Sequence, residues 1–237
     1  MALLFVTGAS SGLGRDTAAE LLEQGHDVVV HGRRPERFAS DHLPWRGTVT
    51  GDLSDLAATQ EVARQANEFG RFDAVIHNAG ALRSPEALPV NVIAPYVLTA
   101  LMLKPARLVY LSSSMHRGGS TDLSRLGSGA ASYSDTKLWV TALSQAFAFR
   151  WPDTVSHSVD PGWVPTRMGG SAAPDDLTEG RRTQLWLATA PEIVPMTGGY
   201  WHHLRTERPQ ASATDPVFQH QLIDELARTT GLSLDPH

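Results

Sequence analysis

The sequence predicts an α/β fold, a single doubly wound domain with a mostly parallel sheet of about seven strands flanked by helices. Short apolar segments, typical of buried strands, alternate with longer segments of helical periodicity through most of the chain. A glycine-rich turn joins the first strand pattern to the first helix pattern. The 237 residues suffice for one large core, so we expect residues 1–237 to form one domain.

The glycine-rich turn lies at residues 7–14, between an apolar run at residues 3–6 and a segment whose apolar residues recur at helical spacing. Gly8 can adopt backbone angles that a side chain forbids, and Gly12 leaves room for a pyrophosphate against bare backbone. Gly14 allows the helix to pack close to the strand. The free N–H groups of the helix N-terminus then favour bound phosphates.

This context predicts a Rossmann-type dinucleotide site, although a glycine-rich turn without a ligand is the simpler alternative. The position directly after an N-terminal strand favours the nucleotide site. The loop residues that we expect to contact the cofactor are Thr7, Gly8, Ser10, Ser11, Gly12, Leu13 and Gly14.

The second predicted strand, residues 27–31, bears on the choice of cofactor. In dinucleotide-binding folds the end of this strand meets the adenosine ribose, where a carboxylate would bond the 2′-hydroxyl of NAD. Here Gly32 is followed by Arg33 and Arg34, and a guanidinium can bind a 2′-phosphate through two parallel hydrogen bonds. We therefore expect NADP(H) in preference to NAD(H). The alternative is a pair of solvated surface arginines.

A third predicted strand, residues 48–50, leads to Asp52 and Leu53. We expect both beside the cofactor, because ligands bind at the strand ends of open α/β sheets. Asp52 either contacts the adenine amino group or only pins the turn. Ser54 is placed to act as the N-cap of the helix that follows.

Composition and charge exclude several classes of function. The formal net charge of −5 gives no reason to expect nucleic-acid or anionic-membrane binding. The absence of cysteine excludes disulfides, thiolate catalysis and cysteine–metal sites, and the ten histidines include no H-E-x-x-H pattern, so we expect no metal. The first strand pattern begins close to Met1 and no apolar run approaches the length of a membrane span, so we expect a cytoplasmic protein.

Further strand patterns occur at residues 72–77, 108–111, 155–159 and 199–201. The helical pattern that runs to about residue 150 begins near Tyr133, and Lys137 lies on the same face one turn later.

The segment at about residues 167–197 is the least regular part of the middle of the chain. It contains apolar residues such as Met168, Leu185 and Trp186, which suggest a partly apolar lid that covers the substrate and excludes water. Trp163, just before it, is expected to pack in the core or to wall the substrate pocket.

Six short motifs follow one another along the chain. They are T-G-x-x-x-G-x-G (Thr7, Gly8, Gly12, Gly14), N-A-G (Asn78, Ala79, Gly80), a helix asparagine (Asn91), a serine pair (Ser112, Ser113), Y-x-x-x-K (Tyr133, Lys137) and P-G (Pro161, Gly162) with Val164 and Thr166 after it. In this order they resemble the short-chain dehydrogenase/reductase family, and more closely its carbonyl-reductase and retinol-dehydrogenase-like branch.

The resemblance implies a role for each catalytic position. Ser113 would hydrogen-bond the substrate carbonyl, and Tyr133 would give up or accept the proton. Lys137 would bind the nicotinamide ribose and lower the pKa of Tyr133, and Asn91 would hold a water in a proton relay to Lys137. The cofactor contacts that the resemblance implies come from Asn78, Ala79, Gly80, Tyr133, Lys137, Pro161, Gly162, Val164 and Thr166.

Elementary chemistry agrees with the assignment of Tyr133 and Lys137. A free tyrosine has a pKa of about 10, too high for a base at neutral pH, and a nearby cation favours the phenolate. Within the serine run, Ser114 is the main alternative to Ser113 because successive residues of a strand point in opposite directions. Ser112 is the weaker alternative.

The chain departs from the family pattern in two places that affect the fold. The stretch from Gly80 to Asn91 is shorter than usual, so we expect the start of the next helix to be trimmed. In many relatives that helix forms the dimer interface, so a homo-oligomer is possible but its usual interface is in doubt. The loop from Ser113 to Tyr133 is longer than in compact members and is expected to help cover the substrate.

Together these features predict an NADP(H)-dependent oxidoreductase that reduces a ketone or aldehyde to an alcohol by hydride transfer, with Tyr133 as the proton donor. The expected partner is a fairly apolar small carbonyl or alcohol. The alternatives are an alcohol dehydrogenase that works in the oxidative direction and a non-catalytic NADP-binding sensor on the same fold. A nucleotide-sugar epimerase or dehydratase is a further alternative, but such relatives usually have different glycine spacing and a longer C-terminal region.

Overall fold

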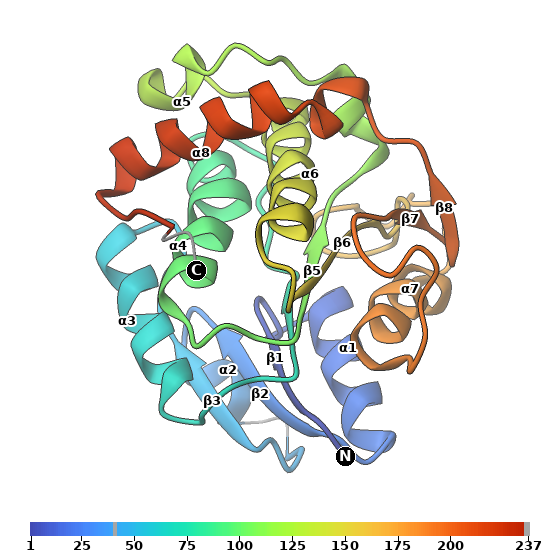
Figure 1. Cartoon of the computed structure of the whole chain (residues 1–237). Helices are drawn as coiled ribbons and strands as arrows, with labels where there is room; N and C mark the ends of the chain where they lie inside the picture. Colours follow the sequence, from blue (N-terminus) through green and yellow to red (C-terminus); the bar gives the residue numbers. More distant parts are fainter. Residues whose placement is uncertain (40–41, 235–237) are drawn as a thin grey trace.

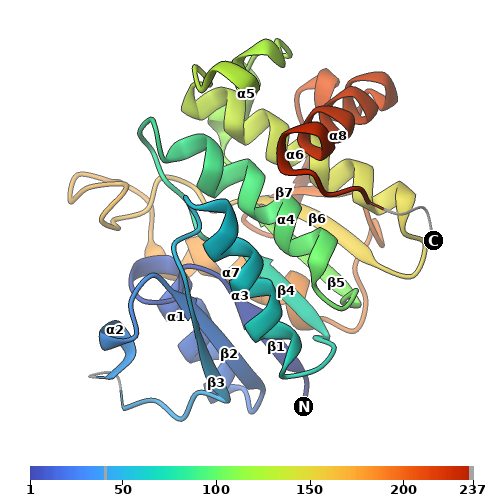
Figure 2. The ribbon, with the colours of Figure 1, turned by 90° about the vertical axis from the view of Figure 1, so that its left-hand side faces the viewer.

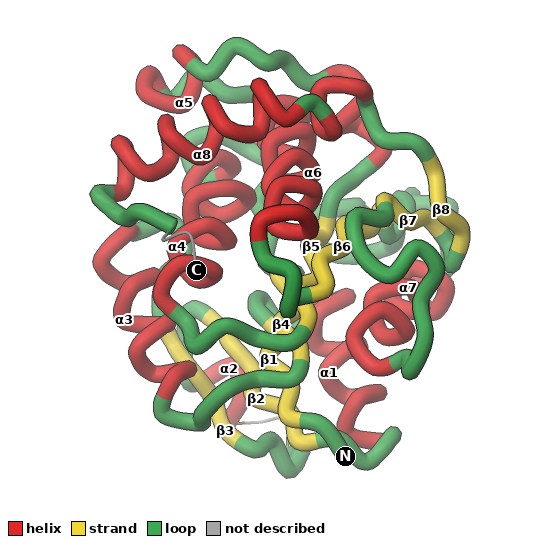
Figure 3. The backbone as a smooth tube through the Cα atoms, viewed as in Figure 1, coloured by secondary structure: helices red, strands yellow, loops and turns green. Residues whose placement is uncertain are grey.

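The computed structural model describes residues 1–39 and 42–234. Within them the chain forms one sheet of eight strands in the order β3-β2-β1-β4-β5-β6-β7-β8 (Figures 1 and 3). The first seven strands are parallel and β8 is antiparallel to β7. The strands are β1 (Leu3–Val6), β2 (Asp27–Gly32), β3 (Gly47–Thr50), β4 (Ala74–His77), β5 (Arg107–Leu111), β6 (Val155–Asp160), β7 (Tyr200–His202) and β8 (Arg205–Glu207).

The doubly wound α/β prediction is therefore confirmed, with eight strands in place of about seven. The additional strand is β8, whose three residues are all exposed. It lacks the apolar run or the alternation by which a buried strand is found in a sequence, and it turns back on β7 as an edge hairpin.

Helices cover both faces of the sheet. α1 and α7 pack together on one face, while α3, α4 and α6 lie on the other (Figure 2). The helices are α1 (Gly12–Glu23), α2 (Glu36–Ala39), α3 (Leu56–Asn67), α4 (Ala94–Leu101), α5 (Ser124–Ser128), α6 (Tyr133–Arg150), α7 (Leu177–Thr189) and α8 (Pro216–Thr230), with the short helical turns η1 (Pro89–Ile93), η2 (Ser114–Gly118) and η3 (Ala211–Thr214).

Helix α6 is the most deeply buried helix that the structure describes. A capping box between Ser132 and Asp135 starts it at Tyr133, and every residue from Asp135 to Ala148 is buried. A helix that is buried all round must be covered on both sides. The sheet covers one side and α8 lies across the other (Figure 1).

The contact between α8 and α6 belongs to the larger of two hydrophobic clusters. Phe218, Leu222 and Leu226 of α8 join the cluster that contains Trp139 and Phe147 of α6. The chain's own C-terminal helix thus occupies the outer face of α6. The neighbouring α4 is short, as expected, and begins after the π-helical turn η1.

Two local predictions differ from the structure. The N-cap of α3 is Asp55, whose carboxylate accepts a hydrogen bond from Ala58 N, and not Ser54. The Ser54 hydroxyl instead donates to Asp52 Oδ1, which also accepts from Ser54 N. Asp52 therefore does pin this turn. Because the Ser54 hydroxyl is bound to Asp52, it does not cap α3.

The segment at 167–197 divides into two parts. Residues 177–189 form α7, in which Leu185 is buried and Trp186 packs against the smaller cluster. These side chains therefore belong to the helix layer of the sheet, and only the part near Met168 lies at the cavity described below. In the described part of the chain, no helix combines the length and the apolar character needed to cross a membrane.

Two adjacent glycines give a matched test of the packing under α6. A Cβ on Gly119 would lie 2.5 Å from Ser134 O and 2.6 Å from Leu138 Cβ, whereas a Cβ on Gly118 would meet nothing within 4 Å. We expect Gly119→Ala to lower the free energy of unfolding by about 1–3 kcal/mol because the helix must shift. Gly118→Ala should change it by less than about 0.5 kcal/mol. Urea unfolding of both variants checks the difference, and equal values would contradict the packing described.

Buried histidines predict how stability depends on pH. Burial lowers the pKa of His31 and His157 from 6.5 to about 4 and that of His77 to about 3. Since these pKa values are depressed in the folded state, the unfolded chain takes up the protons first, and stability present above pH 6.5 is lost as the pH falls towards 4. We expect a slope of roughly 1.4 kcal/mol per pH unit for each histidine in this range.

The pH series is measured by denaturant unfolding. His157→Gln should reduce the slope of the free energy of unfolding against pH. His220→Gln, at a side chain that is 67% exposed, should leave this slope unchanged. A wild-type free energy of unfolding that stays constant between pH 6.5 and 4 would contradict the prediction.

Candidate active site

A cavity of about 1270 Å³ lies at the C-terminal ends of the parallel strands. The loops after β1, β2, β3, β4, β5 and β6 all contribute to its lining. The strand order reverses between β1 and β4, and open α/β sheets bind their ligands at such a switch point. The predicted site residues that line this cavity are Gly8, Ser10, Ser11, Gly12, Leu13, Gly14, Arg33, Asp52, Leu53, Asn78, Ala79, Gly80, Ser113, Tyr133, Lys137, Pro161, Gly162, Val164 and Thr166.

The loop after β1 packs directly on the loop after β4. Gly8 has a φ of +66°, and a Cβ there would lie 2.8 Å from Ala79 Cα. A Cβ on Gly14 would collide with the side chain of Asn78 and would lie 2.7 Å from Gly8 O. Close approach thus requires glycine at both positions, and it leaves backbone N–H groups at the start of α1 as the wall of the cavity.

Thr7 lies behind this wall. It is 1% exposed, and its hydroxyl accepts a hydrogen bond from Ala79 N at 3.0 Å. The Asn78 side chain returns the contact by donating to Thr7 O at 2.9 Å. Thr7 therefore holds the two loops together and does not line the cavity.

His31 is a cavity residue that the sequence analysis missed. Its Nδ1 accepts a hydrogen bond from Gly8 N at 3.2 Å, and its Nε2 lies 3.0 Å from Gly51 O. Because burial keeps the ring neutral, Nδ1 accepts and Nε2 carries the proton. The imidazole thus links the glycine loop to the end of β3. The signal available in the sequence was a histidine within the buried strand at 27–31.

Three arginines line the end of the cavity beside β2. Arg33, Arg34 and Arg37 are all exposed at or just after the end of β2. Hydrogen bonds from Ser54 lower the pKa of Asp52, with a smaller contribution from the charge of Arg33. Arg37 was not predicted; α2 places it one turn after Arg33 and Arg34.

The residues with expected catalytic roles meet at the other end of the cavity. Ser113 and Tyr133 both line the cavity, and the Ser113 side chain is near enough to the Tyr133 hydroxyl to lower its pKa. Lys137 Nζ lies 5.4 Å from the centre of the Tyr133 ring and donates to Leu111 O at 2.8 Å. One helix turn and one strand end thus bring the three side chains together.

The other two serines of the run differ from Ser113 in their surroundings. Ser112 is buried and its hydroxyl lies 2.6 Å from Thr141 Oγ1, inside the fold. Ser114 is exposed at the start of η2. Of the three, Ser113 is the serine whose side chain influences the pKa of Tyr133.

The ionisation of Tyr133 differs from the expectation. Burial and the negative charge of Asp160 raise the pKa of Tyr133 to about 12, against a smaller opposing effect of the Ser113 hydrogen bond. Burial lowers the pKa of Lys137 to about 8, and Asp160 opposes that shift. Tyr133 therefore keeps its proton at neutral pH, the state required of a general acid. Asp160 lines the cavity and was not singled out from the sequence.

Asn91 lies in the π-helical turn η1 and is 2% exposed. Its side-chain amide donates to Ala81 O and to Thr136 Oγ1, and its oxygen accepts from Ala81 N. The amide oxygen and one N–H group thus hold the segment after Gly80, and the other N–H group is bound to α6. The side chain does not line the cavity.

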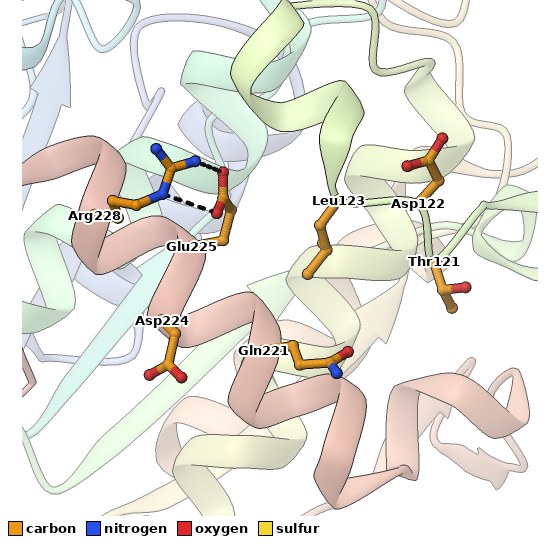
Figure 4. A pocket seen from close by; sticks show the side chains of 7 residues that line it. All are labelled: Thr121, Asp122, Leu123, Gln221, Asp224, Glu225 and Arg228. Atoms are coloured by element: carbon orange, nitrogen blue, oxygen red, sulfur yellow. Dashed lines mark hydrogen bonds and ion pairs between the residues drawn. The ribbon is translucent and has the colours of Figure 1, made fainter.

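A second, shallower pocket lies between residues 121–123 and α8 (Figure 4). Its carboxylates include Glu225, which forms an ion pair with Arg228. It is separate from the strand ends and holds no residue with a predicted role. Among the residues described, no cluster of three or more metal-binding side chains occurs.

Comparison with known proteins places the chain in a family. A model of the short chain dehydrogenase family matches residues 2–177. The uncharacterized oxidoreductase AN7799 of Emericella nidulans is 43% identical over 217 residues, which cover 84% of this chain and 85% of that protein. A Streptomyces protein provisionally named the daunorubicin C-13 ketoreductase DnrU is 28% identical over 264 aligned positions, which cover 96% of this chain and 92% of that protein.

Solved structures share the fold. An uncharacterized protein from Mycobacterium paratuberculosis superposes with a TM-score of 0.81 at 22% identity, over 99% of this chain and 95% of that one. A structure from Escherichia coli CFT073 complexed with NADPH has a TM-score of 0.70 at 25% identity, over 86% of this chain and 97% of that one. The matched residues include the glycine loop and the Tyr133–Lys137 helix. The chain therefore belongs to the short-chain dehydrogenase/reductase family.

Proposed function

We propose that the protein is an NADPH-dependent reductase that converts a ketone or aldehyde to an alcohol. The observation that carries the proposal is the meeting of Ser113, Tyr133 and Lys137 at one end of a cavity whose other end holds arginines. Members of this family use NAD(P)(H), and the provisional name of the Streptomyces relative DnrU is that of a ketoreductase.

The cavity fits a dinucleotide on the evidence of its own backbone. At Gly8 and Gly14 a Cβ would collide with the loop after β4, so bare amides form the wall where a pyrophosphate would lie. Arg33, with Arg34 and Arg37 beside it, would bind a 2′-phosphate. When bound, NADPH supplies the hydride. Every other step falls to the side chains of the protein.

Ser113 would hydrogen-bond the carbonyl oxygen of the substrate and hold it beside Tyr133. The Tyr133 hydroxyl would then pass its proton to that oxygen as the alcohol forms. Lys137, fixed by its hydrogen bond to Leu111 O, would bind the nicotinamide ribose and stabilise the tyrosinate that remains. Because the side chain of Asn91 is already hydrogen-bonded, a relay water beside it would contact its main chain.

The mouth of the cavity favours a fairly apolar substrate. Trp163, Met168 and Met115 line it and are 57%, 40% and 51% exposed. Trp163 Nε1 donates to Gly169 O at 2.8 Å, which fixes the indole against the segment that follows. We propose that residues 163–176 form the substrate-covering part of the chain. The same site could oxidise an alcohol, but a protonated Tyr133 favours reduction.

The first test follows the loss of NADPH absorbance with a panel of ketones, aldehydes and quinones, with Tyr133→Phe as the matched control. We expect turnover of one class by the wild type and at least a hundredfold loss in the variant, because the proton donor is removed. Binding of NADPH should persist. Full activity of Tyr133→Phe would overturn the proposed role, and tight NADPH binding without any turnover would indicate the sensor alternative.

A second test concerns the choice of cofactor. Arg33→Ala should weaken NADPH binding by about tenfold or more, because a charge-assisted hydrogen bond contributes about 1.5–3 kcal/mol. NADH, which lacks the 2′-phosphate, should bind the variant as it binds the wild type. Fluorescence titration with each cofactor measures both constants. An equal effect on NADPH and NADH would show that Arg33 does not contact the 2′-phosphate.

A further inference from the structure

Asp160 is a buried carboxylate at the catalytic end of the cavity. It is the last residue of β6 and is 5% exposed. Val159, just before it, pairs with Leu111 of β5 and accepts a hydrogen bond from Ser112 N at 2.7 Å. Asp160 therefore lies beside the strand end that carries Ser113, and its side chain lines the same cavity as Tyr133 and Lys137.

The carboxylate is held by neutral donors. Its Oδ1 accepts from Gly162 N at 2.9 Å, and its Oδ2 accepts from the Tyr200 hydroxyl at 3.4 Å. Tyr200 is itself fixed by the imidazole of His116, whose ring lies 4.6 Å away. These contacts orient the carboxylate without neutralising it. A buried charge without compensation is costly, so a cation nearby is expected.

Lys137 is a buried cation next to this strand end, because its Nζ donates to Leu111 O and Leu111 pairs with Val159, the residue before Asp160. Lys137 is 4% exposed, and the described hydrogen bond of its ammonium goes to the neutral carbonyl of Leu111. The charge of Asp160 opposes the loss of the Lys137 proton, and the same charge disfavours a negative charge on Tyr133. Both effects follow from Coulomb's law between groups that are largely buried.

We propose that Asp160 is a positioning residue for proton transfer, whose fixed negative charge keeps Lys137 an ammonium and Tyr133 a neutral phenol until the substrate accepts the proton. This inference rests on the proposed function. In that reaction the carbonyl carbon gains the hydride, the carbonyl oxygen gains the Tyr133 proton, and the solvent returns one proton to Tyr133. Asp160 takes no part in the transfer itself, and its charge sets the pH range in which Tyr133 holds its proton.

Other groups face Asp160 from the neighbouring elements. His202 of β7 places Nδ1 3.8 Å from Oδ2. Arg117 of η2 and Glu207 of β8 are paired with each other at 2.8 Å, so their charges offset one another. Burial lowers the pKa of His116 and keeps its ring neutral.

The experiment compares pH profiles of carbonyl reduction for the wild type, Asp160→Asn and Tyr200→Phe. In Asp160→Asn the pKa values of Lys137 and Tyr133 both fall, so the alkaline limb should move to lower pH by about one unit or more. Tyr200→Phe removes a hydrogen bond to Asp160 and keeps the charge of Asp160. The alkaline limb of its pH profile should therefore lie at the same pH as that of the wild type. Asp160→Glu should also keep the wild-type limb, whatever happens to kcat. If Asp160→Asn does not fold, Asp160→Ser gives the same comparison.

A second readout needs neither cofactor nor turnover. The ultraviolet absorbance of tyrosinate is recorded after a rapid jump to alkaline pH, and the signal of a matched Tyr133→Phe variant is subtracted in each background. The Tyr133 signal should develop near pH 12 in the wild type and at lower pH in Asp160→Asn. The chain's other tyrosines cancel in the subtraction.

The two proposals fail in different ways. A wild type that reduces no carbonyl overturns the proposed function, while the absorbance experiment still tests Asp160. An active wild type whose alkaline limb and tyrosinate signal are unchanged in Asp160→Asn overturns the role of Asp160 alone. A shift of the same size in Tyr200→Phe would also overturn it, because the effect would then come from packing.

Discussion

The site depends on the hydrogen bond from Lys137 Nζ to Leu111 O, which ties the buried helix α6 to the end of β5. The donor lies on α6, the helix that contains both Tyr133 and Lys137. The acceptor, Leu111, is the last residue of β5 and comes two residues before Ser113. Because α6 is buried on both sides, its ammonium cannot turn to bulk water. The bond therefore fixes the distance between helix and strand, and with it the position at which a substrate oxygen would meet both hydroxyls.

The glycine loop fixes a second distance, the one between the loops after β1 and β4. Gly8 packs against Ala79, the Thr7 hydroxyl accepts from Ala79 N, and the Asn78 side chain donates to Thr7 O, so the loops after β1 and β4 are held to each other. His31 joins that unit to the end of β3. A dinucleotide bound here would rest on backbone whose shape is set by contacts inside the protein, independent of the ligand.

Most of the fold could be predicted from the sequence because its strands are apolar runs and its glycines stand at strand ends. Seven of the eight strands were found in this way, and all the predicted site residues except Thr7 and Asn91 line one cavity. Their catalytic and cofactor roles stay predictions. The shared cavity follows from topology, since parallel strands bring their carboxyl ends to one edge.

What could not be predicted depends on contacts between distant residues. His31 and Asp160 look like ordinary polar ends of strands, and only their partners Gly51 and Tyr200 reveal what they hold. The sequence suggested that residues 177–189 belong to a lid, because the apolar side chains of this segment are visible in the sequence but the helix they pack against, α1, is not. The burial and the carboxylate that raise the pKa of Tyr133 likewise come from elsewhere in the chain.

The position of α8 has a consequence for synthesis of the protein. The helix that bears Tyr133 and Lys137 is translated well before α8, which follows it by more than sixty residues. Until Phe218, Leu222 and Leu226 emerge, the outer face of α6 has no cover and its apolar side chains face water. Helix α6 is thus synthesised early and reaches its final surroundings late, and a chaperone that binds exposed apolar helices would find α6 accessible during that interval.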